Sequence, residues 1–153
     1  MPVESILIAV GTDVSRQAAL AEAAVAVAAP ADAAVELVHV YSREEYETVT
    51  EELNYDTETP PSPDDLADRH RGLRDAVDVL DGAEVAYDTH GVVGDYAEKV
   101  VSMATDLDVD RVYIGGRERS PAGKALFGST SQDVLMNAPC PVTYVRHGVA
   151  ASD

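Results

Sequence analysis

The stretch DRVYIGGRERSPAGKALFGSTSQDVLMNAPCPVTYVR, residues 110–146, decides the fold because it holds a complete strand, loop, helix and strand. DRVYIGG (110–116) is short, apolar and rich in β-formers, and it ends on two glycines. After a glycine-bracketed loop, STSQDVLMNA (129–138) has a helical pattern and PVTYVR (141–146) is typical of a strand. A strand joined to the next through a helix predicts parallel pairing by a right-handed crossover.

The same alternation of strand and helix extends back to the start of the chain. SILIAV fits a strand buried on both faces, and the alanine-rich segment that follows it favours a helix. In chain order, further strands and helices are expected at 5–10, 11–29, 34–40, 64–80, 83–89 and 96–109. The sequence therefore predicts one α/β domain over residues 1–153, a Rossmann-like or flavodoxin-like three-layer α/β/α fold around a five-stranded open parallel sheet. Residues 147–153 are expected to form a disordered tail.

One segment does not fit a tight connection between a strand and a helix. Residues 42–65 are acidic, rich in Thr and Pro, and longer than most loops in compact domains. Such a composition predicts a flexible acidic loop. The alternative is a lid over a pocket or a partner site, since long loops on α/β scaffolds often carry function.

Composition excludes several classes of protein. The chain has 153 residues, of which 46% are hydrophobic, enough for one domain with a core. No run approaches the roughly 18 apolar residues that a membrane span needs, and the first ten residues lack the features of a signal peptide, so a cytoplasmic location is expected. Cys140 is the single cysteine and the four histidines are scattered, so neither a disulfide scaffold nor a metal site is predicted.

The charge is unusual and unevenly placed. The formal net charge is -17, from 28 acidic and 11 basic residues, and Lys99 and Lys124 are the two lysines. A dispersed acidic surface repels nucleic acid and anionic membranes, so neither is an expected partner, and the scarcity of lysine suggests a halophilic protein. Arg117, Arg119 and Lys124 nevertheless gather in one loop, which points to an anionic ligand there.

That loop has the composition of a phosphate-binding loop. In open α/β sheets, ligands bind beyond the carboxyl ends of the strands where the strand order reverses, which selects residues 11–15, the segment after Tyr41, and 115–127. Glycines let backbone N–H groups approach a phosphate, and a helix start adds positive potential. Ser129 could bond a phosphate oxygen, or it could cap its helix.

Two well-known phosphate motifs do not fit. A P-loop would need a glycine where Glu118 stands and Ser or Thr where Ala125 stands. The dinucleotide fingerprint should follow the first strand, where the sequence is GTDVSR.

The residues instead resemble the universal stress protein family over about residues 3–146. ILIAVGTDVSRQAAL, LVHV, GDYAEKVV and APCPV all have equivalents in that family, and VYIGGR is followed by Gly128-Ser129 thirteen residues after Gly115. With its acidic, lysine-poor surface the chain looks like a haloarchaeal member. The resemblance implies a Rossmann-like domain that acts in stress response and, in one branch of the family, binds an adenine nucleotide.

The resemblance also implies the residues of the site. The nucleotide-binding residues would be Gly11, Asp13, Val40, Ile114, Gly115, Arg117, Lys124, Gly128, Ser129 and Thr130. The ligand would be ATP or AMP, with or without Mg²⁺. Two positions depart from the pattern of the nucleotide-binding branch: Glu118 replaces its middle glycine, and Gly11 replaces an aspartate. Asp13 could reach a ribose hydroxyl or cap the first helix, and Val40 could line the adenine or belong to the core.

Three readings of function follow. The first is nucleotide binding without catalysis, since no base and nucleophile pair is evident and any ATP hydrolysis would be slow and incidental. The second is a dimeric interaction module with an empty pocket. For both readings the resemblance implies a homodimer through the C-terminal strand, where Val142 and Tyr144 could face the partner. The third is a flavodoxin-like flavin protein, which the near absence of aromatic residues around the loops disfavours.

Overall fold

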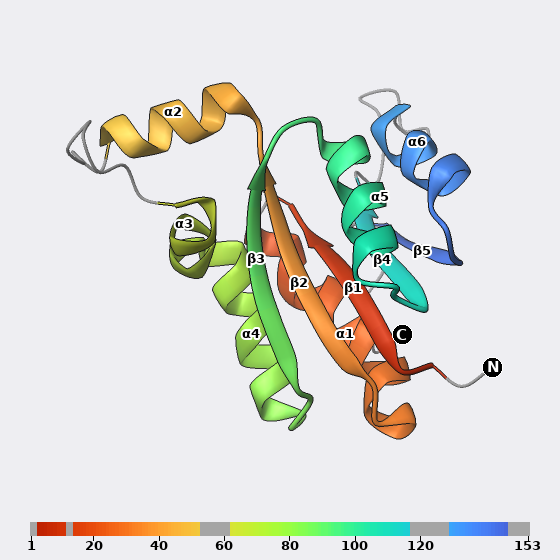
Figure 1. The fold of residues 1–153 in the computed structure, drawn as a ribbon. Helices are drawn as coiled ribbons and strands as arrows, with labels where there is room; N and C mark the ends of the chain where they lie inside the picture. The colour runs from red at the N-terminus through yellow and green to blue at the C-terminus, as the bar shows by residue number, and fades with distance from the viewer. Residues whose placement is uncertain (1–2, 12–13, 53–61, 117–128, 147–153) are drawn as a thin grey trace, which may run out of the picture.

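The computed structural model describes residues 3–11, 14–52, 62–116 and 129–146, and it shows an open sheet between two layers of helices (Figure 1). The elements are β1 (Ser5–Val10), α1 (Val14–Ala31), β2 (Ala34–Tyr41), α2 (Arg43–Glu52), α3 (Pro63–Arg69), α4 (Arg71–Gly82), β3 (Tyr87–Val93), α5 (Tyr96–Asp106), β4 (Arg111–Gly116), α6 (Ser129–Asn137) and β5 (Val142–Arg146). The strands pair in parallel in the order β3-β2-β1-β4-β5. The predicted five-stranded parallel α/β fold is confirmed.

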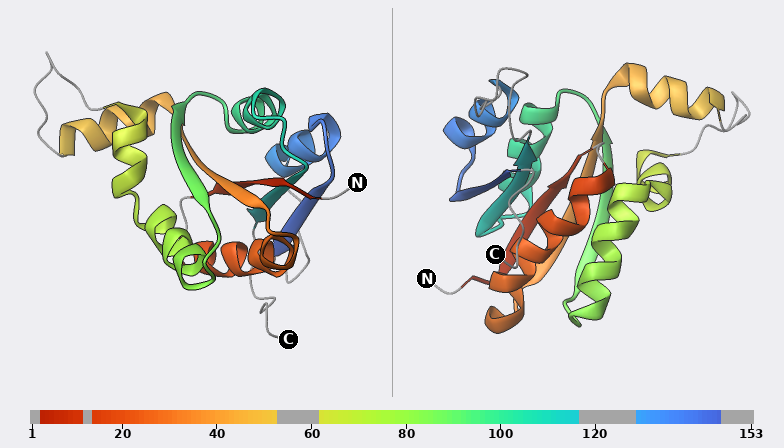
Figure 2. Two further views of the ribbon diagram at one scale, coloured as in Figure 1. Left: turned by 60° about the horizontal axis from the view of Figure 1, so that its bottom comes forward. Right: turned by 180° about the vertical axis from the view of Figure 1, so that it is seen from behind.

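The two faces of the sheet are buried by different helices. Helices α1, α3 and α4 lie on one face and α5 and α6 on the other, as the two views of Figure 2 show. Along β1, Ile6, Ile8 and Val10 contribute to the first core, while Leu7 and Ala9 contribute to the second. All five are at most 1% exposed, because alternate residues of a strand point to opposite faces. The prediction of a first strand buried on both sides is therefore correct.

The strand order reverses between β1 and β4. From β1 the chain adds β2 and β3 on one side of the sheet, then returns to place β4 and β5 on the other. β1 and β4 are paired in register up to Ala9 and Ile114. The helices after these two strands, α1 and α6, lie on opposite faces, so the connections diverge at this point. The expected ligand-binding edge of the sheet is thus at the carboxyl ends of β1 and β4.

The third strand begins later than the sequence predicted. Residues 83–89 were expected to be extended, but α4 continues to Gly82 and Glu84 has a left-handed φ of 58°. Val85 donates its N–H to Leu80 O and is 8% exposed, so it closes the helix end and joins the core. β3 then covers Tyr87–Val93. The apolar residues at the start of the predicted strand therefore belong to a helix-terminating turn.

The predicted helix over 64–80 is two helices. His70 has φ -68° and ψ 126°, so it ends α3 and begins α4. Leu66, Leu73 and Leu80 are all buried, as their spacing indicated, but they belong to different helices. The apolar pattern located the core face correctly and could not show the break.

The acidic segment 42–65, expected to be a flexible loop, contains regular structure. Helix α2 covers Arg43–Glu52 and α3 begins at Pro63. Ser42 starts α2, since its hydroxyl accepts from Glu45 N at 3.0 Å and its carbonyl from Tyr46 N at 2.9 Å. The residues between the two helices and the expected tail at 147–153 lie outside the described residues. No helix in the described part of the chain has the length and apolar character of a membrane span.

Candidate functional site

Five of the predicted site residues lie at the carboxyl edge of the sheet. Gly11 directly follows β1, Val40 and Gly115 are near the ends of β2 and β4, and Ser129 and Thr130 form the exposed start of α6. The sheet topology therefore brings these separate segments to one edge. Asp13, Arg117, Lys124 and Gly128, together with Glu118, lie outside the described residues.

Val40 and Ile114 belong to the core beneath this edge. Val40 is 8% exposed and Ile114 fully buried, and both pack in the cluster that α5 and α6 cover. Ile114 thus supports the site from below and presents no surface to a ligand. Val40, beside the exit of β2, keeps a small exposed area at the edge.

Gly11 is held between two helices. Its N–H donates to Gln17 Oε1 of α1 at 2.9 Å, and its carbonyl oxygen lies close to Gly72 of α4, 3.4 Å from where a Cβ on that glycine would be. Gln17 is itself 4% exposed. The Gly11 N–H is therefore used within the protein, and Gln17 anchors the connection between β1 and α1.

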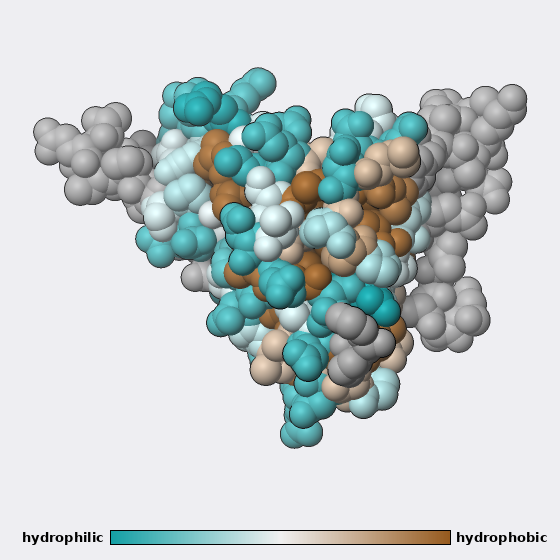
Figure 3. Space-filling view, turned by 45° about the vertical axis from the view of Figure 1, so that its right-hand side comes forward, coloured by the Kyte–Doolittle hydropathy of each residue, from teal (hydrophilic) through white to brown (hydrophobic). Residues whose placement is uncertain are grey.

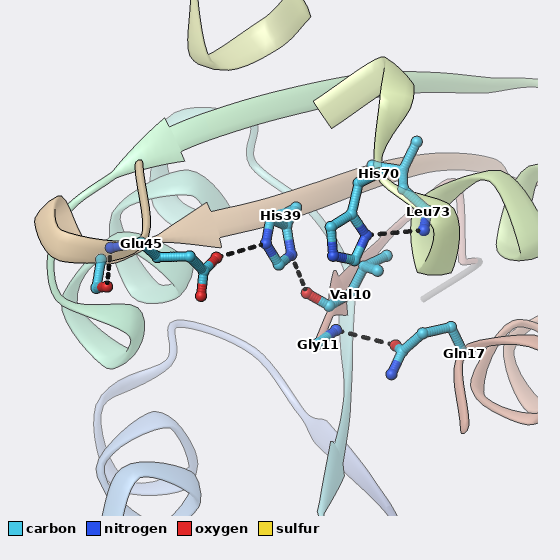
Figure 4. Close-up of polar contacts among 8 residues, drawn as sticks. Val10, Gly11, Gln17, His39, Glu45, His70 and Leu73 are labelled. Carbon is cyan, nitrogen blue, oxygen red and sulfur yellow. Dashed lines mark hydrogen bonds and ion pairs between the residues drawn. The ribbon is translucent and has the colours of Figure 1, made fainter. Parts of the chain in front are cut away.

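A cluster of two histidines, a tyrosine and a glutamate lies beside this edge, and Figure 4 shows the histidines and the glutamate. His39 of β2 is 1% exposed, and its Nδ1 and Nε2 are 2.9 Å from Val10 O and 3.1 Å from Glu45 Oε1 of α2. The ring of His70 stacks on that of His39, with centroids 3.9 Å apart, and Tyr41 meets His39 edge-on at 4.4 Å. Elements far apart in the sequence are thereby joined around one buried imidazole.

His70 acts as the N-cap of α4. Its Nδ1 accepts a hydrogen bond from Leu73 N at 3.2 Å, which requires that nitrogen to be unprotonated. Burial, and then the neighbouring His39, lower the pKa of His70 to about 4. Burial and then the charge of Glu45 raise the pKa of Tyr41 to about 12, so this tyrosine keeps its proton.

Acid is expected to destabilise the protein through His70. The folded-state pKa is below the ordinary histidine value, so the stability that the neutral ring contributes is present above about pH 6.5 and is lost as the pH falls toward about 4. The loss should be on the order of 1–2 kcal/mol, less than the full linkage value because the ring is only partly buried. Urea unfolding across this pH range measures it. His70→Asn keeps a capping side chain without the titration, so an unchanged pH slope in that variant would contradict the assignment.

This cluster was not predicted from the sequence, in which the histidines are far apart. The available signals were a polar residue, His39, inside an otherwise buried strand, and the capping pattern Ser42-x-x-Glu45. Nothing in the sequence indicated that His39 and His70 would stack. Among the described residues, no group of three potential metal ligands is present.

Cys140 behaves as a packed residue. It is partly buried against the core that α5 and α6 cover. Burial raises the pKa of its thiol, so the thiolate is disfavoured. This agrees with the interpretation that it is not a nucleophile.

These features define the chain as a doubly wound α/β protein of Rossmann-like type, with its candidate site at the switch point between β1 and β4. The model of the universal stress protein family matches residues 2–146. The chain therefore belongs to the universal stress protein family, and the resemblance in its sequence is confirmed.

Comparisons with individual proteins agree with this assignment. A universal stress protein of Mycolicibacterium smegmatis (strain ATCC 700084 / mc(2)155) is 35% identical over 71 residues, which is 45% of this chain. The match spans 55% of that relative's length.

Solved structures of the family share the fold. A universal stress protein from Archaeoglobus fulgidus superposes with a TM-score of 0.67 at 24% identity, covering 93% of this chain and 98% of that one. A universal stress protein in complex with cAMP superposes with a TM-score of 0.64 at 22% identity, and the match covers 95% of this chain and 98% of that one. An Arabidopsis thaliana family member with AMP bound superposes with a TM-score of 0.56 at 14% sequence identity. The match covers 95% of this chain and 93% of that one. At these identities the likeness shows the fold.

Proposed function

We propose that the protein binds an adenine nucleotide, AMP or ATP, at the carboxyl ends of β1, β2 and β4, and that it acts in stress response. The observation that carries the proposal is that Gly115, Val40 and the start of α6 all lie along the carboxyl edge of the sheet, at or beside the switch point between β1 and β4. Two solved relatives have cAMP and AMP bound. A site at this place is where a doubly wound sheet holds such a ligand.

The residues present fit the phosphate end of a nucleotide. Ser129 and Thr130 are exposed in the first turn of α6, where hydroxyls and free backbone N–H groups can donate to an anion. In the β4–α6 loop, Arg117 and Lys124 would offset the repulsion that a charge of -17 exerts on a phosphate. Mg²⁺, if it accompanies ATP, would neutralise the same phosphates.

The ribose end departs from the family pattern. Gly11 supplies no side chain, and its N–H is bonded to Gln17. Asp13 in the same connection is the acid that we propose for a ribose hydroxyl. Gly115, Ser129 and Thr130, the described residues at the phosphate end, provide no paired base and nucleophile, and we propose binding in place of catalysis.

The proposal includes a cytoplasmic homodimer formed through β5. β5 is an edge strand, with Val142 and Tyr144 partly buried against the core. On the adjacent α6, Met136 is 75% and Leu135 37% exposed. Figure 3, which turns the side with α5, α6 and β5 forward, shows apolar surface among hydrophilic residues. The same surface would serve a dimeric interaction module, and the acidic, lysine-poor composition supports a halophilic setting for either.

Release and rebinding of the ligand test the function. Protein purified at high salt should release an adenine nucleotide on denaturation, identified by mass spectrometry. The stripped protein should then bind AMP or ATP saturably, and Gly128→Val should weaken this binding about tenfold or more, because a side chain there blocks approach of the backbone to phosphate. Absence of saturable binding leaves the interaction module as the function, and a valine variant that binds like the wild type refutes the loop assignment.

A further inference from the structure

We propose that His39 and Glu45 form a one-proton clamp that fixes helix α2 to the carboxyl ends of β1 and β2 and thereby positions Gly11 and Val40, which adjoin Val10 and His39 in the proposed nucleotide site. The geometry of the imidazole is the basis, since both ring nitrogens face oxygen acceptors. The effect on the ligand rests on the proposed nucleotide function, whereas the clamp itself does not.

The hydrogen bonds require one proton more than a neutral imidazole and a carboxylate carry together. Val10 O can only accept, so His39 Nδ1 must donate to it at 2.9 Å. The remaining contact, between His39 Nε2 and Glu45 Oε1 at 3.1 Å, then needs a proton as well. The pair therefore exists either as imidazolium with carboxylate or as neutral imidazole with a carboxyl group that donates.

The side chain of Glu45 bonds to the sheet, although its sequence pattern predicts a local hydrogen bond within the helix. Ser42-x-x-Glu45 is a capping-box pattern, in which the glutamate would turn back to the N–H of the first residue. Ser42 does cap α2, but the Glu45 carboxylate reaches His39. The first turn of α2 is thus tied to the sheet by a side chain that could instead have bonded to the backbone N–H of Ser42.

The clamp stands at the base of a projecting helix. All three ribbon views show α2 extending away from the sheet beyond the end of β2 (Figures 1 and 2). Contacts of its first turn with the sheet include the Glu45 bond to His39 and the approach of Tyr46 to Tyr41, with ring centroids 6.3 Å apart. Release of Glu45 would free the helix while leaving the rest of the domain packed.

The surroundings of His39 determine how the clamp responds to pH. Glu45 faces it from α2, Tyr41 from β2 and His70 from the start of α4. Tyr41 and His70 stay uncharged near neutral pH, because the pKa of Tyr41 is raised to about 12 and that of His70 is lowered to about 4. Glu45 is therefore the one charged group among them, and its carboxyl group shares the bridging proton with His39 Nε2. Loss of that proton would leave the lone pair of Nε2 facing a carboxylate, and the clamp would open.

Three variants test the clamp. Glu45→Gln supplies an amide N–H that donates to the neutral ring, so it keeps the clamp without the extra proton. Glu45→Ala removes the contact. Glu44→Gln makes the same charge change at an exposed position of the same helix and is the matched control.

Hydrogen exchange of the α2 amides, corrected for the intrinsic rate, is the primary measurement. In wild type and Glu44→Gln, exchange should accelerate about tenfold or more as the pH is raised and the bridging proton is lost. Glu45→Gln should show no such rise, and Glu45→Ala should exchange fast throughout. A wild-type pH response shared by Glu45→Gln, or slow exchange in Glu45→Ala, would overturn the clamp. Unfolding curves confirm that each variant is folded.

The affinity for AMP, measured over the same pH range, tests the link to the site. It should fall with rising pH in wild type and stay level in Glu45→Gln. If the protein binds no nucleotide, the proposed function is refuted, and the hydrogen-exchange result alone decides whether the clamp exists. Equal pH dependence in both proteins refutes the positioning role.

Discussion

Replacing Gly91 with alanine is expected to lower the free energy of unfolding by about 3 kcal/mol. Gly91 lies in β3 directly beneath α3. A Cβ on Gly91 would be 1.9 Å from Pro63 O and 2.9 Å from the Ala67 Cβ, and the first of these is backbone that cannot rotate away. The Gly91 N–H also donates to Asp64 Oδ1 at 2.7 Å. Alanine must therefore push α3 off the sheet and strain this hydrogen bond.

Urea unfolding measures the effect, and Gly82→Ala is the matched control. Gly82 ends α4, and nothing lies within 4 Å of where its Cβ would be. Since alanine is the better helix former, this control should be neutral or more stable by up to about 1 kcal/mol. If Gly91→Ala were as stable as wild type, α3 would not pack against β3 as described.

The double substitution Ser129→Ala/Thr130→Ala is expected to weaken AMP binding by about a hundredfold, with little loss of stability. Both side chains are exposed in the first turn of α6, so they contribute little to packing. Each hydroxyl that donates to a charged phosphate contributes about 1.5–3 kcal/mol. Calorimetric titration of the stripped protein gives the affinity, and urea unfolding gives the stability.

The same experiment separates the two roles that the sequence left open for Ser129. If Ser129 only caps α6, its replacement would lower the free energy of unfolding by about 1 kcal/mol and leave the affinity for AMP unchanged. Ser102→Ala, at an exposed position on α5, is the control for a lost helical hydroxyl. Unchanged affinity in the double variant would remove both hydroxyls from the proposed site.

The elements predicted most accurately are those whose sequence pattern reflects burial. SILIAV is apolar from Ile6 to Val10 because β1 is the central strand, and it was located to the residue. β2, its neighbour, was placed within one residue for the same reason. The edge strand β5 was also placed within one residue, because its residues are strong β-formers. Adjacent parallel strands in the middle of a sheet must be apolar on both faces, so their sequence is a strong signal.

The errors in the predicted elements arose where side-chain interactions determine the backbone conformation. β3 is at the sheet edge and less apolar, and the left-handed turn at Glu84 displaced its start. The break between α3 and α4 depends on His70 serving both helices. The bond from Glu45 to His39 joins two segments whose proximity only the tertiary structure supplies. For the site, the sequence indicated the correct edge of the sheet, and it could not show that the Gly11 N–H bonds to Gln17.

Titration of ¹⁵N-labelled protein with AMP, followed by amide chemical shifts, tests the nucleotide site most directly. Saturable shifts are expected at Gly11, Val40, Gly115, Ser129 and Thr130, with none at Asp32 and Gly82 on the opposite edge of the sheet. Shifts confined to that opposite edge, or no saturable shifts with AMP or ATP, would contradict the account.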